Sequence, residues 1–294
     1  MLLLDLGVFN KKAHEIKTRE ALIWSAVWIG CAGIFTALIY QWLGHEKAWQ
    51  FATAYVIEKS LSIDNLFVFI LIFTYFKIGK VYQHKILFWW ILGALIMRAI
   101  FIYLGVQVLE MFHWVMYVFG AFLIVSAVKM LFEGKEEIEF ERKLIVRMLK
   151  KIMPISKIKD THSFFVTENG KRAATSLFVA LLIIEMTDLV FAIDSIPAVL
   201  AISQDMFIVY TSNIFAILGL RSLYFALSGV MGKFSYLRYG LAAVLAFVGI
   251  KMLISGYYHF PIGLSLGIII GCITLSIVAT YIFPTKNNEI EDLL

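Results

Sequence analysis

Residues 175–201 read Thr175-Ser-Leu-Phe-Val-Ala-Leu-Leu-Ile-Ile-Glu185-Met-Thr-Asp188-Leu-Val-Phe-Ala-Ile-Asp194-Ser195-Ile-Pro197-Ala-Val-Leu-Ala201. This run is long enough to cross a bilayer core, which takes roughly 20 apolar residues, yet it contains acids. The whole chain of 294 residues is 61% hydrophobic and 16% charged. A water-soluble domain of that composition would expose large apolar patches, so the sequence excludes a soluble enzyme.

Seven other stretches of the chain are similarly long and apolar, at about 21–42, 49–76, 86–104, 112–132, 207–227, 239–255 and 262–283. In lipid, a helix is the only open-ended structure that satisfies its own backbone polar groups. The strands of a membrane barrel would alternate over about ten residues, whereas these runs are continuous. The sequence therefore predicts one all-α integral membrane domain, residues 1–294, with eight transmembrane helices.

The basic residues predict the orientation of these helices. With both termini in the cytoplasm, 20 of the 26 Lys and Arg residues fall in cytoplasmic segments and only Lys47 falls in an outer loop. The other five lie within helices. This asymmetry is a strong positive-inside signal. Tryptophans near helix ends fit an aromatic belt at the membrane surface: Trp42, Trp49, Trp89, Trp90 and Trp114.

The longest cytoplasmic loop is predicted at 133–174. It starts with an acidic run and continues through 142–154 as a basic amphipathic stretch. Such a stretch can lie on an anionic membrane surface or form a solvated linker, and it carries no predicted chemistry. The chain contains two cysteines, Cys31 and Cys272, without metal-binding or disulfide spacing, so we interpret them as inert core residues.

Two of the predicted helices share a pattern of acids. Helix two contains Glu58-Lys-Ser-Leu-Ser-Ile-Asp64-Asn65, and helix five contains Asp188-Leu-Val-Phe-Ala-Ile-Asp194-Ser195. Arginine and lysine then recur in the same order in the two helices that follow, as Arg98 with Lys129 and as Arg221 with Lys251. These matches indicate duplication of a three-helix unit.

Because three helices are an odd number, the second copy must enter the membrane from the opposite side. Residues 49–132 form the first unit and 175–256 the inverted second unit, with helices one and eight peripheral. Inverted repeats are typical of secondary transporters, whose site lies at the repeat interface. The inversion places Asp64 level with Asp188 and Glu58 level with Asp194. Pro197 is expected to kink helix five beside Asp194 and to free carbonyl groups.

Buried acids need a compensating cation, because each ionised group at the bilayer centre costs about 2.5 to 3.5 kcal/mol. Arg98 and Arg221 are the deep basic partners, whereas Lys129 and Lys251 can reach water from helix ends. The basic side chains therefore fall short of the five acids, Glu58, Asp64, Glu185, Asp188 and Asp194. A bound cation is the favoured interpretation, with structural ion pairs as the alternative.

The oxygen ligands indicate which cation would bind. Carboxylates, the Asn65 amide, the Ser195 hydroxyl and freed carbonyls suit Mn²⁺, Mg²⁺ or Ca²⁺ and disfavour copper or zinc. All six histidines fall in loops or at helix ends. Protons are the natural competitors of the metal ion at crowded carboxyl groups. The predicted metal-handling residues are Glu58, Asp64, Asn65, Asp188, Asp194 and Ser195.

Other motifs give no chemistry. Gly263-Leu-Ser-Leu-Gly267 resembles a hydrolase motif, but it lies in an apolar helix. With Gly271 it forms a ladder of small residues that predicts a helix-packing face or homodimer seam. The sequence contains no Walker A motif. The expectation is a transporter in the lipid bilayer, without enzymatic activity, a permanently bound cofactor or a nucleic-acid partner.

The two acidic motifs, Glu58 to Val68 and Glu185 to Ala198, resemble the paired signatures of the TerC family, named for tellurite resistance. The similarity extends over about 21–283, and the amino-terminal portion most resembles the Alx-like branch. The resemblance implies a bacterial inner-membrane protein associated with manganese export and with metal or alkaline stress. It also implies that the metal-handling positions are those of the two motifs.

The leading hypothesis is a secondary exporter of Mn²⁺, driven by protons or by the membrane potential. Glu185 is interpreted as a ligand on the cytoplasmic approach, and Arg98 and Arg221 as charge-balancing or gating residues. One alternative is a membrane scaffold of a stress complex that acts through the 133–174 loop. Another is a sodium or potassium antiporter.

Overall fold

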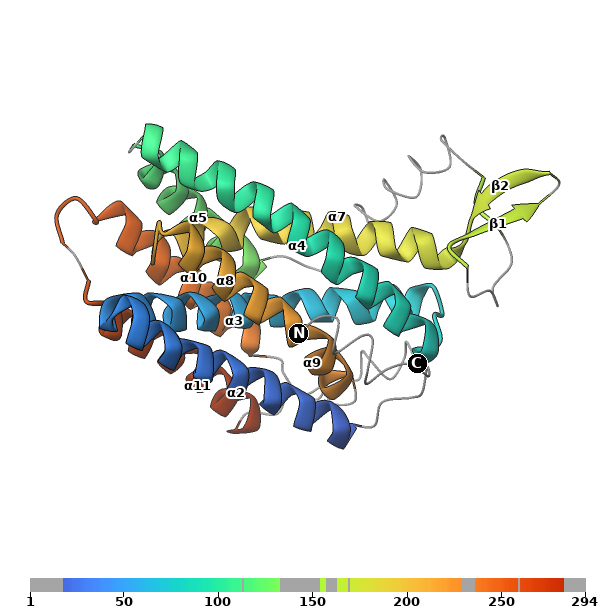
Figure 1. The fold of residues 1–294 in the computed structure, drawn as a ribbon, viewed down its shortest axis with the longest axis horizontal. Helices are drawn as coiled ribbons and strands as arrows, with labels where there is room; N and C mark the ends of the chain where they lie inside the picture. The colour runs from blue at the N-terminus through green and yellow to red at the C-terminus, as the bar shows by residue number, and fades with distance from the viewer. Residues whose placement is uncertain are drawn as a thin grey trace.

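A computed structural model describes residues 18–112, 114–132, 154–156, 163–168, 170–228, 236–258 and 260–282. Most of the predicted amphipathic stretch at 142–154 lies outside these residues. The described helices are α2 (Thr18–Leu43), α3 (His45–Tyr75), α4 (Lys80–Met111), α5 (Val115–Phe132), α7 (Ser176–Leu200), α8 (Met206–Leu218), α9 (Leu220–Leu227), α10 (Leu237–Leu253) and α11 (Ile262–Ile282). Figure 1 shows them as a bundle of long helices, which confirms that the described structure is mainly helical.

A short β hairpin precedes α7, where the sequence predicted only loop. Strands β1 (Phe165–Glu168) and β2 (Lys171–Ala174) pair antiparallel, and Gly170 turns between them with φ of 74°. Glycine accommodates this left-handed conformation without the steric cost of a Cβ. The hairpin lies beyond the amino-terminal end of α7, at one end of the bundle (Figure 1).

Six helical stretches of the described chain are long and apolar enough to cross a membrane: Arg19–Leu43, Lys80–Met111, Val115–Phe132, Ser176–Leu200, Met206–Leu227 and Ile262–Ile282. The predicted count of eight is not confirmed by this criterion. The other two predicted spans coincide with α3 and α10. Helix α3 has too many charged residues for the criterion, because Glu58, Lys59 and Asp64 are close in its sequence, and α10 is too short, with 17 residues. The protein is therefore a multi-pass membrane protein whose α3 is unusually charged.

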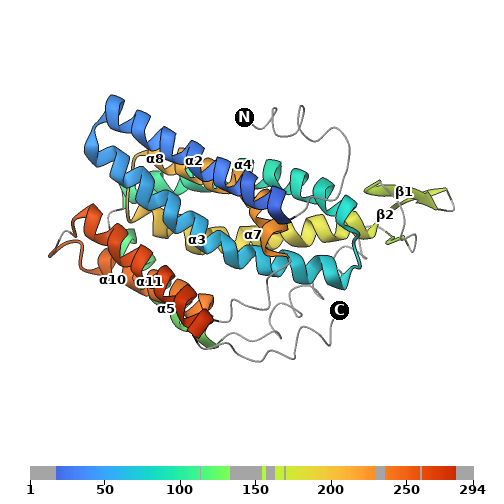
Figure 2. The same cartoon turned by 90° about the horizontal axis from the view of Figure 1, so that it is seen from below.

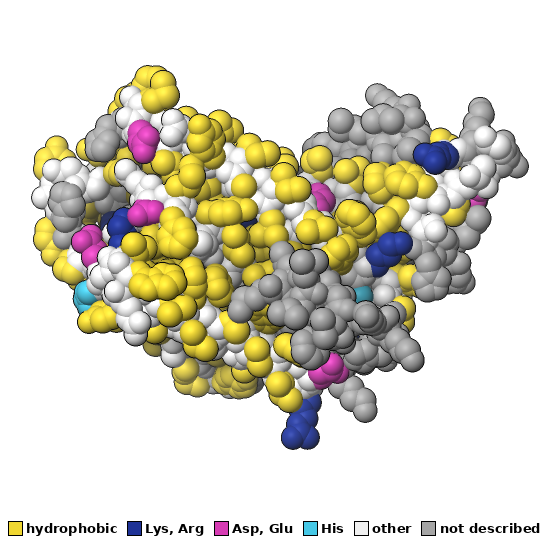
Figure 3. Space-filling model, viewed as in Figure 1, with side chains coloured by type: hydrophobic (Ala, Val, Ile, Leu, Met, Phe, Trp, Pro, Cys, Tyr) yellow, Lys and Arg dark blue, Asp and Glu magenta, His cyan; other side chains and the backbone are white. Residues whose placement is uncertain are grey.

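The surface of the bundle is apolar, as a lipid-facing surface must be. Hydrophobic side chains cover most of the described face in Figure 3. The tryptophans predicted for the aromatic belt divide into two groups: Trp42, Trp49, Trp89 and Trp114 are exposed, but Trp90 is fully buried. The belt interpretation is wrong for Trp90, whose ring packs edge-on against Phe69 inside the core.

Helix α3 lies at the centre of the structure, because it packs against α2, α7, α8 and α11. Helices α5 and α10 pack most extensively against each other, and α11 covers α10. Figure 2 shows α5, α10 and α11 as a group set at an angle to the remaining helices. We call α5 and α10 the helix pair, and α3, α4, α7 and α8 the scaffold.

The helix pair crosses through two glycines. A Cβ on Gly120 would lie 2.9 Å from the carbonyl oxygen of Gly249, and a Cβ on Gly249 would lie 2.7 Å from the carbonyl oxygen of Gly120. Both distances are too short for any side chain. Small residues allow membrane helices to approach backbone to backbone in this way. The other glycine ladder, Gly263, Gly267 and Gly271 on α11, faces open space, and its homodimer seam stays a prediction.

The interruption of a helix occurs at a different place from the one predicted. Helices α3 and α7 are each continuous, and Pro197 lies inside the last turn of α7. The predicted span 207–227 is instead divided at Gly219 into α8 and α9. Lys59 donates a hydrogen bond of 3.1 Å to the carbonyl of Ala216, beside this break. A proline near a helix end removes a bond from the last turn only, so the helix is not interrupted.

Lys47 and Asp205 tie the first residues of α3 and α8 together through a contact of 2.7 Å. Asp205 is also the amino-terminal cap of α8, since its Oδ1 accepts from the backbone N–H groups of Phe207 and Ile208. Partial burial tends to raise the pKa of Asp205, but the hydrogen bond and charge of Lys47 and the two backbone N–H groups outweigh it. The pKa of Asp205 is therefore lowered.

A lowered pKa means that Asp205 stabilises the fold above the ordinary pKa of about 3.9 and loses this effect as pH falls through the lower folded value. We expect Asp205→Ala to reduce the free energy of unfolding by about 1 kcal/mol at pH 7. The difference from the wild type should shrink at pH 3 and below. Unfolding in detergent at both pH values measures this, with Glu110→Gln as an exposed control. An unchanged difference across pH would contradict the assignment.

Candidate metal centre

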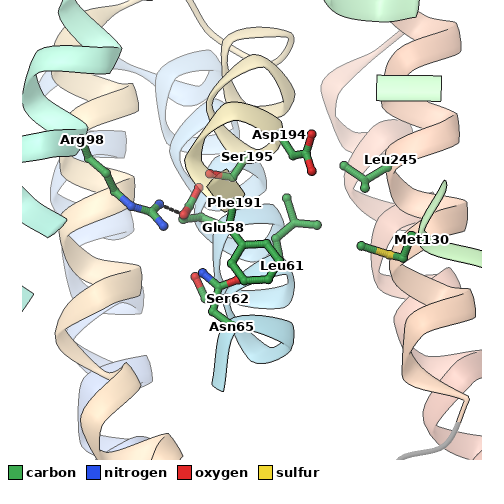
Figure 4. Close-up of a pocket in the computed structure, with 10 residues that line it drawn as sticks. All are labelled: Glu58, Leu61, Ser62, Asn65, Arg98, Met130, Phe191, Asp194, Ser195 and Leu245. Carbon is green, nitrogen blue, oxygen red and sulfur yellow. Dashed lines mark ion pairs between the residues drawn. The ribbon is translucent and has the colours of Figure 1, made fainter. Parts of the chain in front are cut away.

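A small cavity lies between the scaffold and the helix pair. Its volume is about 20 Å³, which accommodates one particle the size of a water molecule. The side chains that line it come from five helices: Glu58, Leu61, Ser62 and Asn65 from α3, Arg98 from α4, Met130 from α5, Phe191, Asp194 and Ser195 from α7, and Leu245 from α10. Figure 4 shows the polar side chains on the scaffold and Met130 and Leu245 facing them across the cavity.

Arg98 is the centre of a buried ion-pair network. Its Nη1 contacts Oε1 of Glu58, and its Nη2 lies 3.3 Å from Oδ1 of Asp188 (Figure 4 shows the first contact). Nη1 also donates to Oδ1 of Asn213 on α8, at 2.6 Å. All four side chains are buried. One guanidinium thus joins an acid of α3 to an acid of α7.

The two acidic motifs meet directly at Asn65. Its Nδ2 donates a hydrogen bond of 3.2 Å to Oδ1 of Asp188, the same oxygen that Arg98 contacts. Asp188 is therefore held from α3 and from α4. This arrangement fixes Asp188 in place but leaves it outside the lining of the small cavity.

Asp194 occupies a different environment. It lines the cavity, and its Oδ1 accepts a hydrogen bond of 2.7 Å from Ser126 Oγ on α5. This bond connects the scaffold to the helix pair. In Figure 4 the Asp194 carboxylate points away from Glu58 and toward Leu245.

Five buried oxygen atoms around the cavity have no hydrogen-bond partner: both carboxylate oxygens of Glu58, Ser62 Oγ, Asn65 Oδ1 and Ser195 Oγ. Oε1 of Glu58 is in ion contact with Arg98, whereas the other three residues contribute neutral oxygens. A buried polar atom without a partner costs about 1 to 3 kcal/mol. The three neutral oxygens, together with the carboxylate of Asp194, form a set of oxygen donors that a hard cation would satisfy. The residues present therefore fit a divalent metal ion.

The predicted cluster of four carboxylates is revised by these contacts. Glu58 and Asp188 are engaged by Arg98, and Asp194 by Ser126. The side chain of Asp64 lies outside the described residues. Among the side chains that are described, no group of three or more His, Cys, Asp or Glu residues is close enough to hold a metal ion. Any site here would thus combine a carboxylate with neutral oxygens.

The accessory residues lie around this centre. Glu185 is half-buried one turn before Asp188, and its carboxylate occupies the space where Gly93 of α4 lacks a side chain. Arg221 is buried at the start of α9. Neither residue lines the small cavity, so their predicted roles as an approach ligand and a balancing charge stay predictions.

Two residues of the centre escaped the sequence interpretation: Ser126, which contacts Asp194, and Asn213, which contacts Arg98. Neither belongs to a repeated motif. Their signal was weaker but present, because each is a polar residue inside a long apolar span, where polar groups usually find a partner on another helix.

Known proteins resemble this chain over nearly all of its length. Residues 43–288 match the family described as "Integral membrane protein TerC family". "Uncharacterized membrane protein STKORF319" of Myxococcus xanthus is 51% identical over 282 residues, which cover 96% of this chain and 88% of that protein. "Putative membrane-bound redox modulator Alx" of Escherichia coli strain K12 is 41% identical over 287 residues, covering 95% and 89%. No solved structure matches.

Proposed function

Because this chain belongs to the TerC family of integral membrane proteins, we propose that it exports a divalent metal cation, Mn²⁺ in the first place, by alternating access. Protons or the membrane potential would drive the export. Ca²⁺ and Mg²⁺ are the other ions that the oxygen donors suit. The host membrane would be a bacterial inner membrane, with both termini in the cytoplasm as the basic residues predict.

The observation that carries this proposal is the donor set of the small cavity. Asp194 supplies one negative charge, and Ser62, Asn65 and Ser195 supply neutral oxygens that lack hydrogen-bond partners. A cation of charge two that binds there would satisfy these atoms and would compensate the carboxylate in an apolar interior. Asp64, one residue before Asn65 in the sequence, is the second carboxylate that we assign to the ion.

Glu58 and Asp188 have a different role in this proposal. Arg98 holds one oxygen of each, so the two acids and the guanidinium form a compensated unit beside the ion site. Such a unit can orient the Asn65 amide, because its Nδ2 donates to Asp188. When the ion arrives, Glu58 or Asp188 can release a carboxylate oxygen from Arg98 to bind it. The approach from the cytoplasm would pass Glu185, and Arg221 would balance charge near α8.

The helix packing supports eight crossings and the inverted repeat. The first unit would consist of α3, α4 and α5, and the second of α7, α8–α9 and α10. If a twofold axis relates the two units, each contact of a helix in one unit with the other unit must have a counterpart in the reverse direction. Helix α3 packs against α8 just as α7 packs against α4, and α5 packs against its counterpart α10. A transport site at such an interface is typical of secondary transporters.

The redox role in the name of the Alx relatives has less support here. The two cysteines of the chain, Cys31 and Cys272, are both free and lie on different helices, α2 and α11. The buried oxygen donors favour ion transport over thiol chemistry.

Purified protein in sealed lipid vesicles tests the export function, with pH controlled on both sides. We expect Mn²⁺ flux above that of empty vesicles, competition by Ca²⁺ or Mg²⁺, and little effect of Na⁺. Absence of flux for every divalent ion would refute the proposal, and inhibition by Na⁺ alone would favour an antiporter of monovalent ions.

A scrambled order of residues 133–153 tests the scaffold alternative, because it leaves the hairpin β1–β2 and every described helix unchanged in sequence. A transporter should keep most of its flux in vesicles after this change. A scaffold would lose its function in cells, whereas its vesicles would show no flux before or after the change.

A further inference from the structure

The small cavity has a larger neighbour on the same interface. This outer cavity has a volume of about 620 Å³. Its scaffold wall includes Ala201 and Gln204 after the end of α7, and its opposite wall includes Met116 of α5 and Met252 of α10. Both cavities therefore have one wall on the scaffold and one on the helix pair. Two cavities therefore lie along the interface between these two groups of helices.

The two cavities lie at successive levels of the same helices. Asp194 of α7 and Ala201, the residue that caps the end of α7, are seven residues apart, and Leu245 and Met252 are seven residues apart on α10. Seven residues of helix span about 10 Å. Between these levels, Val199 of α7 and Val248 of α10 are fully buried in one apolar cluster. Apolar side chains are therefore buried on both helices at the level between the two cavities.

The two helices of the pair are packed closely against each other. They touch backbone to backbone at Gly120 and Gly249, without intervening side chains that could change rotamer. Just beyond the end of α10, Ser255 Oγ lies 3.2 Å from Met116 Sδ of α5. A close backbone crossing resists sliding, whereas the cavity-lined interface with the scaffold has less packing to lose on separation.

We propose that α5 and α10 move as a unit against α3 and α7, and that Ser126 is the positioning residue that closes the ion site through its hydrogen bond to Asp194. The inference rests on the proposed export function, and it identifies the moving part. A metal ion that binds Asp194 competes with Ser126 for the same carboxylate. The hydrogen bond between Ser126 and Asp194 forms only when the helix pair is closed against the scaffold. Ion binding weakens this bond, and it can therefore shift the equilibrium from the closed toward the open arrangement.

Reversible cross-links between cysteines test the motion. In a background with Cys31→Ser and Cys272→Ser, the pair Ala201→Cys with Met252→Cys bridges the two walls of the outer cavity. A short bis-thiosulfonate reagent should reduce Mn²⁺ flux about tenfold or more in this variant, and a reductant should restore it. An equal effect on a matched control, or no effect here, would overturn the inference.

The matched control bridges two residues of the helix pair itself. Met116→Cys with Ser255→Cys joins α5 to the turn that follows α10, where the native side chains are in contact. Because these two helices move together, the same reagent should leave flux within about twofold of the unlinked protein. Strong inhibition of this control would show that α5 and α10 move relative to each other.

Distances between spin labels test the motion without relying on flux. Labels on Trp42→Cys and Tyr257→Cys, both exposed positions, report the separation of α2 from the end of α10. We expect two distances whose proportions change with added Ca²⁺, and one distance for the control Trp114→Cys with Tyr257→Cys. For the first pair of labels, Ser126→Ala should increase the proportion of the distance that belongs to the open arrangement, because the hydrogen bond to Asp194 is lost. Ser126→Thr keeps the hydroxyl and should give the wild-type proportions.

The outcomes separate the two proposals. Changing distances without flux of any metal ion would refute the export function and leave the moving helix pair intact. Metal flux with one fixed distance in every variant would refute the moving pair and leave the export function intact. A Ser126→Ala variant with wild-type proportions of the two distances would remove Ser126 from the mechanism.

Discussion

Asp194→Asn is expected to lower Mn²⁺ flux by roughly 100-fold or more. Loss of a side chain that merely supports a metal ligand already costs about 10- to 100-fold in affinity or activity. Asp194 is the described carboxylate that lines the small cavity without contacting Arg98, so it would be a direct ligand. The amide keeps the size of the side chain and its hydrogen bond with Ser126 but removes the charge. Flux in vesicles and equilibrium binding of Mn²⁺ measure the effect.

The matched control for this change is Asp205→Asn, the same substitution at the amino-terminal cap of α8, outside both cavities. It should keep flux within about twofold of the wild type. The amount of Asp194→Asn protein in the membrane should equal that of the wild type, because the amide can make the same hydrogen bond. Wild-type flux and binding in Asp194→Asn would contradict the site assignment.

Arg98→Met should destabilise the protein by about 3 to 5 kcal/mol, the cost of removing one partner from a buried ion pair. The change leaves Glu58 and Asp188 without the guanidinium that contacts both, and it removes the donor to Asn213. Methionine fills a similar volume, so the loss reports the charge and the hydrogen bonds. Unfolding in detergent by heat or by a denaturing surfactant measures it.

A second substitution should recover much of this loss. Glu58→Gln in the Arg98→Met background removes one of the uncompensated charges, so the double variant should be more stable than Arg98→Met alone. Arg238→Met, at an exposed arginine, should change the free energy of unfolding by about 0.5 kcal/mol or less. If Arg98→Met were as stable as the wild type, the buried network would contribute nothing.

The apolar runs predicted where the helices lie, because burial of backbone polar groups in lipid leaves little choice of structure. The last run, at 262–283, corresponds to α11 at Ile262–Ile282, and the run at 175–201 corresponds to α7. Helix α4 is longer than its run of 86–104, since it covers Lys80–Met111. Its polar ends can extend beyond the hydrocarbon layer, so hydropathy underestimates its length.

The partners of the buried charges could not be predicted in the same way. The sequence paired acids with arginines by count, but Arg98 contacts Glu58 and Asp188 together because a planar guanidinium presents several donors. Ser126 and Asn213 reach the centre only through the way that α5 and α8 rotate about their axes. That rotation depends on packing between helices, and no single helix encodes it.

The break at Gly219 was also outside the reach of the sequence interpretation. Pro197 was the more obvious breaker, yet the break lies at Gly219, where a Cβ would meet Lys59 Nζ at 2.6 Å and Trp28 Cβ at 3.1 Å. Any side chain there would require these neighbours from α3 and α2, which are distant in the sequence, to shift. A local pattern cannot reveal crowding by such distant residues.

The crossing of α5 and α10 has a genetic consequence. When two bulky side chains oppose each other, enlargement of one is commonly offset by a smaller residue opposite. At Gly120 and Gly249 this remedy does not exist, because each glycine faces the backbone of the other and no smaller amino acid is available. A screen for suppressors of Gly120→Val should therefore recover no change at codon 249, and revertants should restore glycine itself.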